Sequence, residues 1–192
     1  MSESFEPISN AITTGLTVEL YLDPDAEANI RAFRELIYQQ GVKPVLGAMN
    51  DKPHISLAVL PAMDPESVIE LTARLAGQFN PFAVRLGAVG TFPTHENVLF
   101  LFPVPSTSLL SVHAAMHRML HEMKITSSSY YFPGNWIPHL TLEFNLENSE
   151  LDTSVEVFRK HFQPIDGTVT QLGVVGFRPI QYLRQFTLKK LQ

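Results

Sequence analysis

The chain has 192 residues, a size typical of one domain or of two small lobes that share a core, and 45% of its residues are hydrophobic. That composition argues against disorder over most of the length. A formal net charge of −5 argues against a protein that coats nucleic acid through a broad basic surface. The absence of cysteine excludes disulfides, thiolate nucleophiles and cysteine zinc sites.

The two ends of the chain differ in charge. The opening stretch MSESFEPISN is acidic and polar and lacks the basic and apolar regions of a secretion signal. No apolar run approaches the ~18 residues of a membrane helix, so we expect a cytoplasmic protein without a membrane partner. From residue 167 onward the chain has four cations and no acid, which leaves room for a local phosphate site. These cations are Arg178, Arg184, Lys189 and Lys190.

The first half of the chain alternates between patterns typical of strands and of helices. Val18, Leu20 and Leu22 share one face of an expected strand at 16–22. The sequence DPD at 23–25 places a proline and acids in a first helical turn, which predicts a helix from 26 to 40. The expected elements that follow are a strand at 53–60, a helix from 64 to 75 and a strand at 82–89.

The second half continues the alternation. The run 98–104 is continuously apolar, which favours a strand buried on both faces. Serines at 127–129 and the pair Pro133-Gly134 mark 126–134 as a loop. The expected elements are strand 98–104, helix 107–123, strand 136–144, helix 151–162, strand 168–177 and strand 181–189, with a turn at Arg178-Pro179 between the last two.

Both halves therefore have the same order of elements: strand, helix, strand, helix, strand. A repeat this long, present in two copies, does not fit a solenoid. We interpret it as a duplication that gives an α+β fold with two lobes related by a pseudo-two-fold axis. The chain 1–192 is then a single domain, with sequence repeats at about 16–90 and 96–190.

Two short motifs occupy the same place in the two repeats. The first His motif is PHISL at 53–57, and the second His motif is PHLTL at 138–142. In each, the histidine and the hydroxyl residue share one strand face, while the aliphatic residues line the other face. One copy is usually a satisfied surface or core histidine. Two copies in matching places favour a functional site.

The paired motifs suit in-line displacement at phosphorus, which needs a base on one side of the phosphate and an acid on the other. The imidazoles of His54 and His139 titrate near pH ~6.5, so one ring can be neutral while the other is protonated. Ser56 and Thr141 lie roughly 6–7 Å along each strand and can donate to the non-bridging phosphate oxygens. No metal or other cofactor is needed for this chemistry.

The motifs resemble those of the two-histidine (2H) phosphoesterases, which include RNA 2′,5′-ligase-like proteins and cyclic nucleotide phosphodiesterases. Trp136-Ile137-Pro138 before the second His motif and the stretch at 90–101 also resemble that family. The resemblance implies a bilobal fold whose antiparallel sheets line an open cleft, with helices on the outer faces. It also implies that His54 and His139 are the acid/base pair and that Ser56 and Thr141 bind phosphate.

Other residues are candidates for substrate binding. Lys52 and Arg178 are expected to contact substrate phosphate. Trp136 and Tyr130 lie beside the second His motif and can stack a nucleobase, although core packing explains Trp136 as well. Glu143 shares the strand face of His139, where a carboxylate would repel a phosphate. Twist of the strand toward the rim, or pairing with a cation such as Arg178, would each resolve this conflict.

A row of histidines also recurs on the expected helix 107–123. His113, His117 and His121 are spaced by four residues, which can make a metal face. They lie beside an apolar stripe, and no acidic or cysteine ligand is evident nearby. We expect them on the solvent-facing flank of the helix, without a metal.

The sequence thus predicts a metal-independent phosphoesterase that acts on a nucleotide or RNA end. The expected target is a 2′,3′-cyclic phosphate or a 2′,5′ linkage, with hydrolysis favoured in water and ligation as its reverse. The alternative is a non-catalytic module that reads a nucleotide or an RNA end with the same cleft. A metal protein built on helix 107–123 is a third reading. Exact substrate, base preference, which histidine is the acid, and oligomeric state are open at this point, with a monomer as the default.

Overall fold

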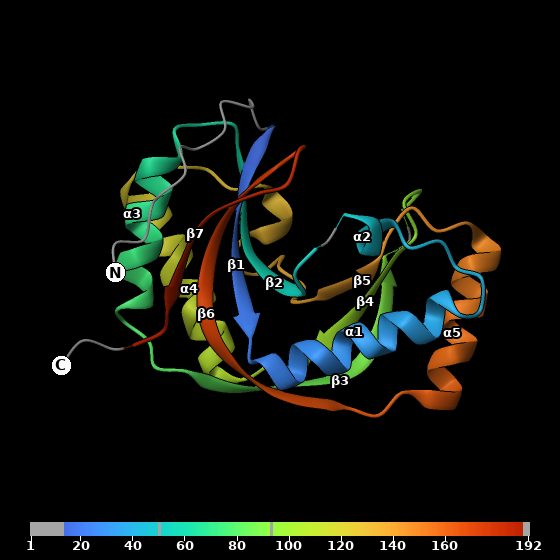
Figure 1. Ribbon diagram of the computed structural model, residues 1–192. Helices are drawn as coiled ribbons and strands as arrows, with labels where there is room; N and C mark the ends of the chain where they lie inside the picture. The colour runs from blue at the N-terminus through green and yellow to red at the C-terminus, as the bar shows by residue number, and fades with distance from the viewer. Residues whose placement is uncertain (1–13, 50, 93, 190–192) are drawn as a thin grey trace, which may run out of the picture.

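The computed structural model describes residues 14–49, 51–92 and 94–189. The opening stretch 1–10, for which no secretion signal is predicted, and the cation Lys190 lie outside the described residues. Within them, seven strands form one sheet in the order β1-β2-β5-β4-β3-β6-β7, in which β1 also pairs with β6 and every pairing is antiparallel (Figure 1). The predicted α+β class is confirmed. The two separate sheets are not, because hydrogen bonds join all seven strands.

The strands are β1 (Gly15–Leu22), β2 (His54–Pro61), β3 (Phe82–Phe92), β4 (Val98–Pro103), β5 (Leu140–Glu143), β6 (Ile165–Phe177) and β7 (Gln181–Thr187). The helices are α1 (Pro24–Tyr38), α2 (Val45–Ala48), α3 (Pro65–Ala76), α4 (Thr107–Glu122) and α5 (Asn148–His161), with a 3-10 turn η1 (Ser129–Tyr131). The short α2 and η1 were not predicted, because neither spans enough residues to show a hydrophobic period.

Helix starts follow from capping side chains. Asp23 accepts a hydrogen bond from Ala26 N at 3.0 Å, and Pro24 opens α1 as its first residue. Helix α5 begins at Asn148, before the predicted residue 151. A capping box explains the difference, because Glu147 N–H donates to the Glu150 carboxylate at 2.9 Å.

The strand that carries the second His motif is shorter than predicted. β5 covers only Leu140–Glu143 instead of 136–144, and it meets β2 at the single pair Ile55↔Leu140. Residues 136–139 lie before the strand. The alternating pattern predicted the face of each side chain, but it did not reveal where backbone pairing begins.

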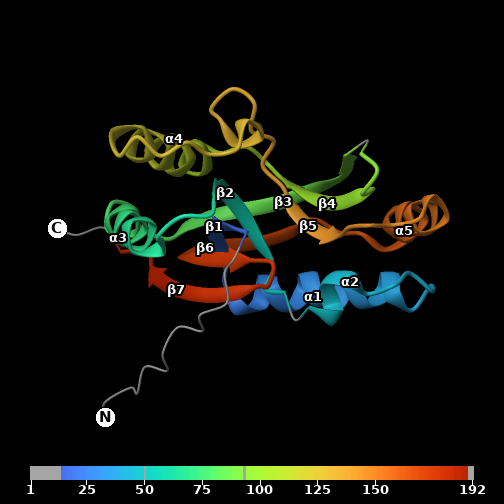
Figure 2. The same ribbon diagram turned by 90° about the horizontal axis from the view of Figure 1, so that it is seen from above.

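The helices gather in two groups, one at the left and one at the right of Figure 1. α3 and α4 lie together on one side, and α1 and α5 lie together on the other, as both views show (Figures 1 and 2). On the second side, the ring centre of Phe33 from α1 lies 4.5 Å from that of Phe158 and 5.7 Å from that of Phe162. This aromatic cluster joins the first half of the chain to the second.

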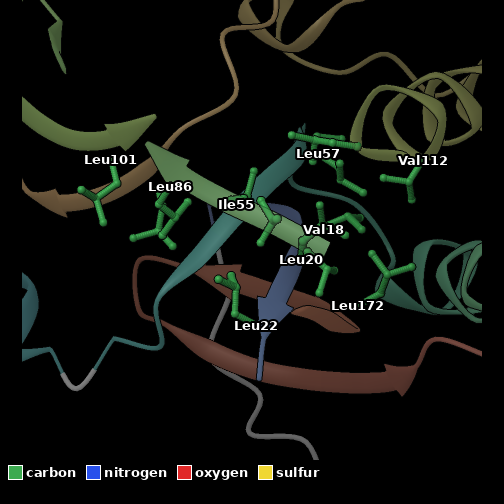
Figure 3. Close-up of a cluster of buried hydrophobic side chains, with 14 of the residues drawn as sticks. Val18, Leu20, Leu22, Ile55, Leu57, Leu86, Leu101, Val112 and Leu172 are labelled. Carbon is green, nitrogen blue, oxygen red and sulfur yellow. The ribbon is translucent and has the colours of Figure 1, made fainter. Parts of the chain in front are cut away.

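The core lies between the sheet and these helices. Figure 3 shows alternate residues of β1 packed against β2, β6 and α4, with Leu20, Ile55 and Leu172 fully buried. The intervening residues Thr17, Glu19 and Tyr21 of β1 lie on the opposite face. The fold therefore places polar side chains of β1 on the same face as His54 and Ser56 of β2.

Two of the three histidines of α4, His113 and His117, hydrogen-bond to backbone carbonyls of neighbouring segments. His113 is buried, its ring stacks on Trp136 at 3.9 Å and 4°, and its Nε2 hydrogen-bonds to Tyr131 O at 2.8 Å. His117 Nε2 hydrogen-bonds to Leu57 O at 3.2 Å. The predicted solvent-facing position is therefore wrong for His113, because a polar ring can be buried once its nitrogen finds a backbone partner.

Among the residues that the structure describes, none of the helices has the length and apolar character needed to cross a bilayer.

Replacing Phe33 by alanine should destabilise the fold by about 3–5 kcal/mol, because it empties the aromatic cluster between α1 and α5. Chemical denaturation of both proteins gives the difference in unfolding free energy. The matched control is Leu36→Ala on the same helix, where the side chain is exposed and the loss should stay below about 1 kcal/mol. Equal losses in the two variants would contradict a stabilising role concentrated at Phe33.

Acid should weaken the fold through His113. Burial, opposed by the bond to Tyr131 O and aided by His117, lowers the pKa of His113 to about 4. Because this value lies below that of the unfolded chain, ~6.5, the stability contributed by the neutral ring is complete above pH ~6.5 and is lost as pH falls toward 4. The loss should reach up to about 3 kcal/mol.

The variant His113→Gln keeps a donor for Tyr131 O but cannot take up the proton. Its unfolding free energy should therefore fall less than that of the parent between pH 6.5 and 4, as measured by urea titration at several pH values. His121→Gln, a change of an exposed side chain on the same helix, is the control and should follow the parent. Parallel curves for the parent and His113→Gln would refute this source of acid sensitivity.

Candidate active site

The pairing of β2 with β5 brings the two His motifs together. Since Ile55 lies opposite Leu140 in antiparallel strands, His54 falls opposite Thr141 and Ser56 falls opposite His139. Ile55 and Leu140 point into the core, so the other four side chains lie on the opposite face, each half-buried. The expected four-residue constellation is therefore assembled on one face of adjacent strands.

Both imidazole rings are oriented in the same way. Nδ1 of His54 lies 2.8 Å from Lys52 O, and Nδ1 of His139 lies 2.8 Å from Ile137 O. A carbonyl oxygen only accepts, so each Nδ1 carries the hydrogen of the neutral ring. This arrangement leaves Nε2 of each ring available to give or take a proton.

His54 lies among carboxylates. Its Nε2 is 3.5 Å from Glu19 Oε1, and its Nδ1 is 3.6 Å from Asp51 Oδ1. Burial by itself lowers the pKa of His54, but the charges of Glu19 and Asp51 and the bond to Lys52 O outweigh burial and the opposing charge of Arg34. The pKa of His54 is therefore raised above its ordinary value.

His139 lies among aromatic rings. The ring centre of Phe92 is 5.0 Å from that of His139, and the ring centre of Phe100 is 5.4 Å away. Burial is the largest effect and lowers the pKa of His139. The bond to Ile137 O opposes it, and the charge of the nearby His54 lowers the pKa further. The pKa values of the two histidines are therefore shifted in opposite directions, so His54 keeps its proton to a higher pH than His139 does.

The segment before β5 contacts Ser56, the hydroxyl residue of the first His motif. Trp136 Nε1–H donates to Ser56 O at 3.1 Å, and the phenol of Tyr131 lies within hydrogen-bonding reach of the Ser56 side chain. Tyr131, whose ring centre is 6.5 Å from that of His139, thus belongs to the site. Tyr130 is 80% exposed and is the more peripheral of the two tyrosines.

Of the two predicted cations, only Lys52 lies beside the histidines. Its Nζ is 4.1 Å from the centre of the Tyr21 ring, and its backbone N–H donates to Tyr182 OH at 2.8 Å. Arg178 is instead exposed at the turn between β6 and β7, where Phe177 pairs with Gly15. His54 pairs with Tyr21 at the other end of β1, about 20 Å away at the usual strand rise. The structure therefore does not bring Arg178 to the histidines.

Glu143 is bonded to other groups of the protein. The side chain is buried and accepts hydrogen bonds from Tyr38 OH at 2.8 Å and from Leu46 N–H at 2.9 Å. Burial raises the pKa of Glu143, against the lowering effect of these bonds. The carboxylate anchors α2 instead of turning to the rim, and the cation whose charge acts on it is Arg34 and not Arg178.

Several residues of the site were not predicted from the sequence. Glu19, Asp51, Phe92 and Phe100 come from β1, the segment before β2, β3 and β4. For Glu19 the available signal was a charged residue in the middle of the apolar stretch LTVELYL, because a strand rarely buries a carboxylate without a partner. For Phe92 and Phe100 it was the resemblance of the stretch 90–101 to the family.

A groove lies apart from the histidines. A groove of about 420 Å³ between α1 and α5 is lined by Leu36, Gln40, Asp152, Thr153, Glu156, Val157, Lys160 and His161. Across the residues with a described position, no three His, Cys, Asp or Glu side chains are grouped so that they could hold a metal ion.

Known proteins resemble this chain in sequence and in fold. A protein of Bacillus cereus strain B4264, provisionally named a phosphoesterase, is 32% identical over 121 residues, which are 59% of this chain and 66% of the relative. A similarly named protein of Bacillus cytotoxicus is 29% identical over 101 residues, 51% of this chain and 55% of the relative. The matches thus span less than two thirds of these relatives.

Two solved structures share the architecture at low sequence identity. TT0787 of Thermus thermophilus has a TM-score of 0.66 and 19% identity, with 93% of this chain and 100% of that chain covered. LigT of E. coli in complex with 3′-AMP has a TM-score of 0.64 and 18% identity, with 93% and 99% covered. The family described as the 2′-5′ RNA ligase superfamily matches residues 21–178, which include both His motifs. The chain therefore belongs to the 2′-5′ RNA ligase superfamily.

Proposed function

We propose that the protein is a metal-independent phosphoesterase that acts on a nucleotide or RNA end, with a 2′,3′-cyclic phosphate or a 2′,5′-phosphodiester as its target. The observation that carries this proposal is the pair of imidazoles, which lie on adjacent strands and have pKa values shifted in opposite directions. A general base and a general acid are thereby available at the same pH without adjustment by a cofactor.

The reaction needs one proton to be taken and one to be given. Neutral His139 removes a proton from water through Nε2 as the water oxygen bonds to phosphorus. The bond from phosphorus to the ribose oxygen breaks, and protonated His54 gives its Nε2 proton to that oxygen. The product is a phosphate ester with one P–O bond made and one broken. Exchange with solvent then restores the resting protonation of both rings.

The hydroxyls of Ser56 and Thr141 hold the phosphate between the rings. Their places opposite the two histidines suit donation to the non-bridging oxygens, whose charge grows in the transition state. Lys52 adds a cation close to His54. For the base, Tyr130 offers an exposed ring, whereas Trp136 has one face already stacked on His113.

Nucleotides in related structures support this substrate class. LigT of E. coli has been crystallised in complexes with 3′-AMP, NADP⁺ and ATP. Excess water favours hydrolysis, and the same groups can serve the reverse ligation because each proton transfer is reversible. A cytoplasmic location and a monomeric state complete the proposal.

The proposal includes a duplicated chain with repeats at about 16–90 and 96–190. Matching strand registers support this duplication. Glu19 pairs with Ser56 directly after a bulge between Val18 and Glu19, and Phe100 pairs with Thr141 directly after a bulge between Leu99 and Phe100. An irregularity shared at equivalent places favours common descent of the two halves.

Removing either imidazole should abolish most turnover. His54→Ala and His139→Ala are each expected to reduce kcat/KM on 2′,3′-cyclic nucleotides by roughly 10²- to 10⁴-fold, with excess chelator present throughout. Product formation by the parent and variants is followed by chromatography, and His161→Ala, at the exposed end of α5, is the control. If the parent binds these ligands without turnover, the protein is a non-catalytic module that binds the nucleotide, and the enzyme hypothesis is wrong.

Removing a phosphate-holding hydroxyl should slow the reaction without changing its pH limits. Thr141→Val and Ser56→Ala should each lower kcat/KM by roughly tenfold to a hundredfold, the worth of a hydrogen bond to a charged group. Steady-state kinetics across pH measures both properties. Thr126→Val, in the loop after α4, should match the parent. Full activity in both site variants would show that Ser56 and Thr141 do not hold the phosphate by hydrogen bonds.

A further inference from the structure

The two sides of the site have the same backbone framework. Glu19 is the strand neighbour of Ser56, and Phe100 is the strand neighbour of Thr141, so they occupy equivalent places. Each also pairs with a glycine on its other side, Gly173 for Glu19 and Gly90 for Phe100. A side chain with a Cβ at either glycine would meet an aromatic ring, at 2.4 Å from Tyr21 and at 2.5 Å from Phe100.

Chemically, the two equivalent places differ. Glu19 presents a carboxylate whose Oε1 is 3.5 Å from His54 Nε2, whereas Phe100 presents a phenyl ring whose centre is 5.4 Å from that of His139. One ring of the histidine pair therefore lies against a negative charge and the other against an apolar surface. The site is symmetric in shape and asymmetric in charge.

The Glu19 carboxylate is fixed in place. It is 4% exposed, Thr17 Oγ1 donates to it at 2.6 Å, and Tyr21 OH donates to it at 2.7 Å. Burial, with the charge of Glu19, raises the pKa of Tyr21 far above its ordinary value, so this hydroxyl remains a donor. Two neutral donors hold the carboxylate without cancelling its charge.

Asp51 is the other carboxylate near His54, and it differs from Glu19 in two respects. It approaches Nδ1, the nitrogen already bonded to Lys52 O. It is also paired with buried Arg34 at 3.2 Å, which offsets part of its charge. Glu19 is therefore the carboxylate that acts on the nitrogen used for proton transfer.

We propose that Glu19 sets the direction of the reaction across the site: it keeps the proton on His54, so the leaving ribose oxygen departs beside His54 and water enters beside His139. The inference rests on the proposed function and deepens it, because it orients the substrate between two otherwise similar sides. Glu19 acts through His54 and is a positioning residue.

Other charged or titratable groups also face the pair. These groups are Tyr21 of β1, Arg34 of α1, Asp51 and Lys52 before β2, Tyr131 of η1 and Tyr182 of β7. The charge of Glu19 also contributes to the raised pKa values of Tyr21, Tyr131 and Tyr182, although burial is the largest cause in each. A shift of the pH profile is therefore assigned to the carboxylate only if a variant that keeps the charge also keeps the profile of the parent.

The test compares Glu19→Gln, which removes the charge, with Glu19→Asp, which keeps it. Two probes are used: 2′,3′-cyclic AMP, whose alkoxide needs a proton to leave, and 2′-deoxyadenosine 3′-(4-nitrophenyl phosphate), whose nitrophenolate does not. Glu143→Gln is the matched control, because it removes a buried carboxylate that holds α2 and has no contact with His54. Unfolding temperatures are measured for all variants.

On cyclic AMP, Glu19→Gln should lower kcat/KM about tenfold at pH 7.5 and move the alkaline limb of the profile to lower pH, with the acid limb unmoved. On the nitrophenyl ester it should stay within about threefold of the parent. Glu19→Asp and Glu143→Gln should keep the alkaline limb of the parent. A faster Glu19→Gln on cyclic AMP, or equal losses on both probes, overturns the inference.

A second comparison needs no variant of Glu19 and therefore holds even if that variant does not fold. His54→Ala should retain most activity on the nitrophenyl ester, whereas His139→Ala should lose activity on both probes. The reverse pattern overturns the proposed direction while leaving a two-histidine phosphoesterase intact. A parent inactive on both probes removes the proposed function itself, and the inference with it.

Discussion

The candidate site depends on one backbone pairing, Ile55 opposite Leu140. That contact is where the strand of the first His motif meets the strand of the second, and antiparallel geometry then fixes which side chains face one another. A slip of β5 by one residue against β2 would turn His139 into the core and Leu140 outward. The buried aliphatic residues of both motifs oppose that slip, so the packing of the core also sets the geometry of the chemistry.

Burial and charge then give the two rings different properties on a shared framework. Both are held by a backbone carbonyl two residues earlier, yet one lies beside Glu19 and the other beside Phe100. Desolvation disfavours the charged ring in both cases, and only the carboxylates reverse it at His54. The carboxylates of Glu19 and Asp51 thus distinguish two rings that share one backbone framework, as the proposed division between an acid and a base requires.

The sequence predicted the parts of this arrangement that local pattern controls. The Asp-Pro pairs marked two helix starts, and alternation predicted that each histidine shares a face with its hydroxyl. What it missed depends on contacts between distant segments: the early end of pairing in β5, the burial of His113 against Trp136, and the place of Glu19 beside His54. Arg178 was misplaced because its strand end was predicted without its register to β1.

The interlocking of the two halves has a consequence for the making of the protein. α1 from the first half packs on α5 from the second, and β6 from the second half completes the sheet beside β1. Since α1 and β1 pack against α5 and β6, which follow much later in the sequence, a growing chain cannot complete these contacts before β6 has been synthesised. The pairing of β2 with β5 that assembles the candidate site is likewise a contact between distant segments, so its geometry depends on the second half of the fold.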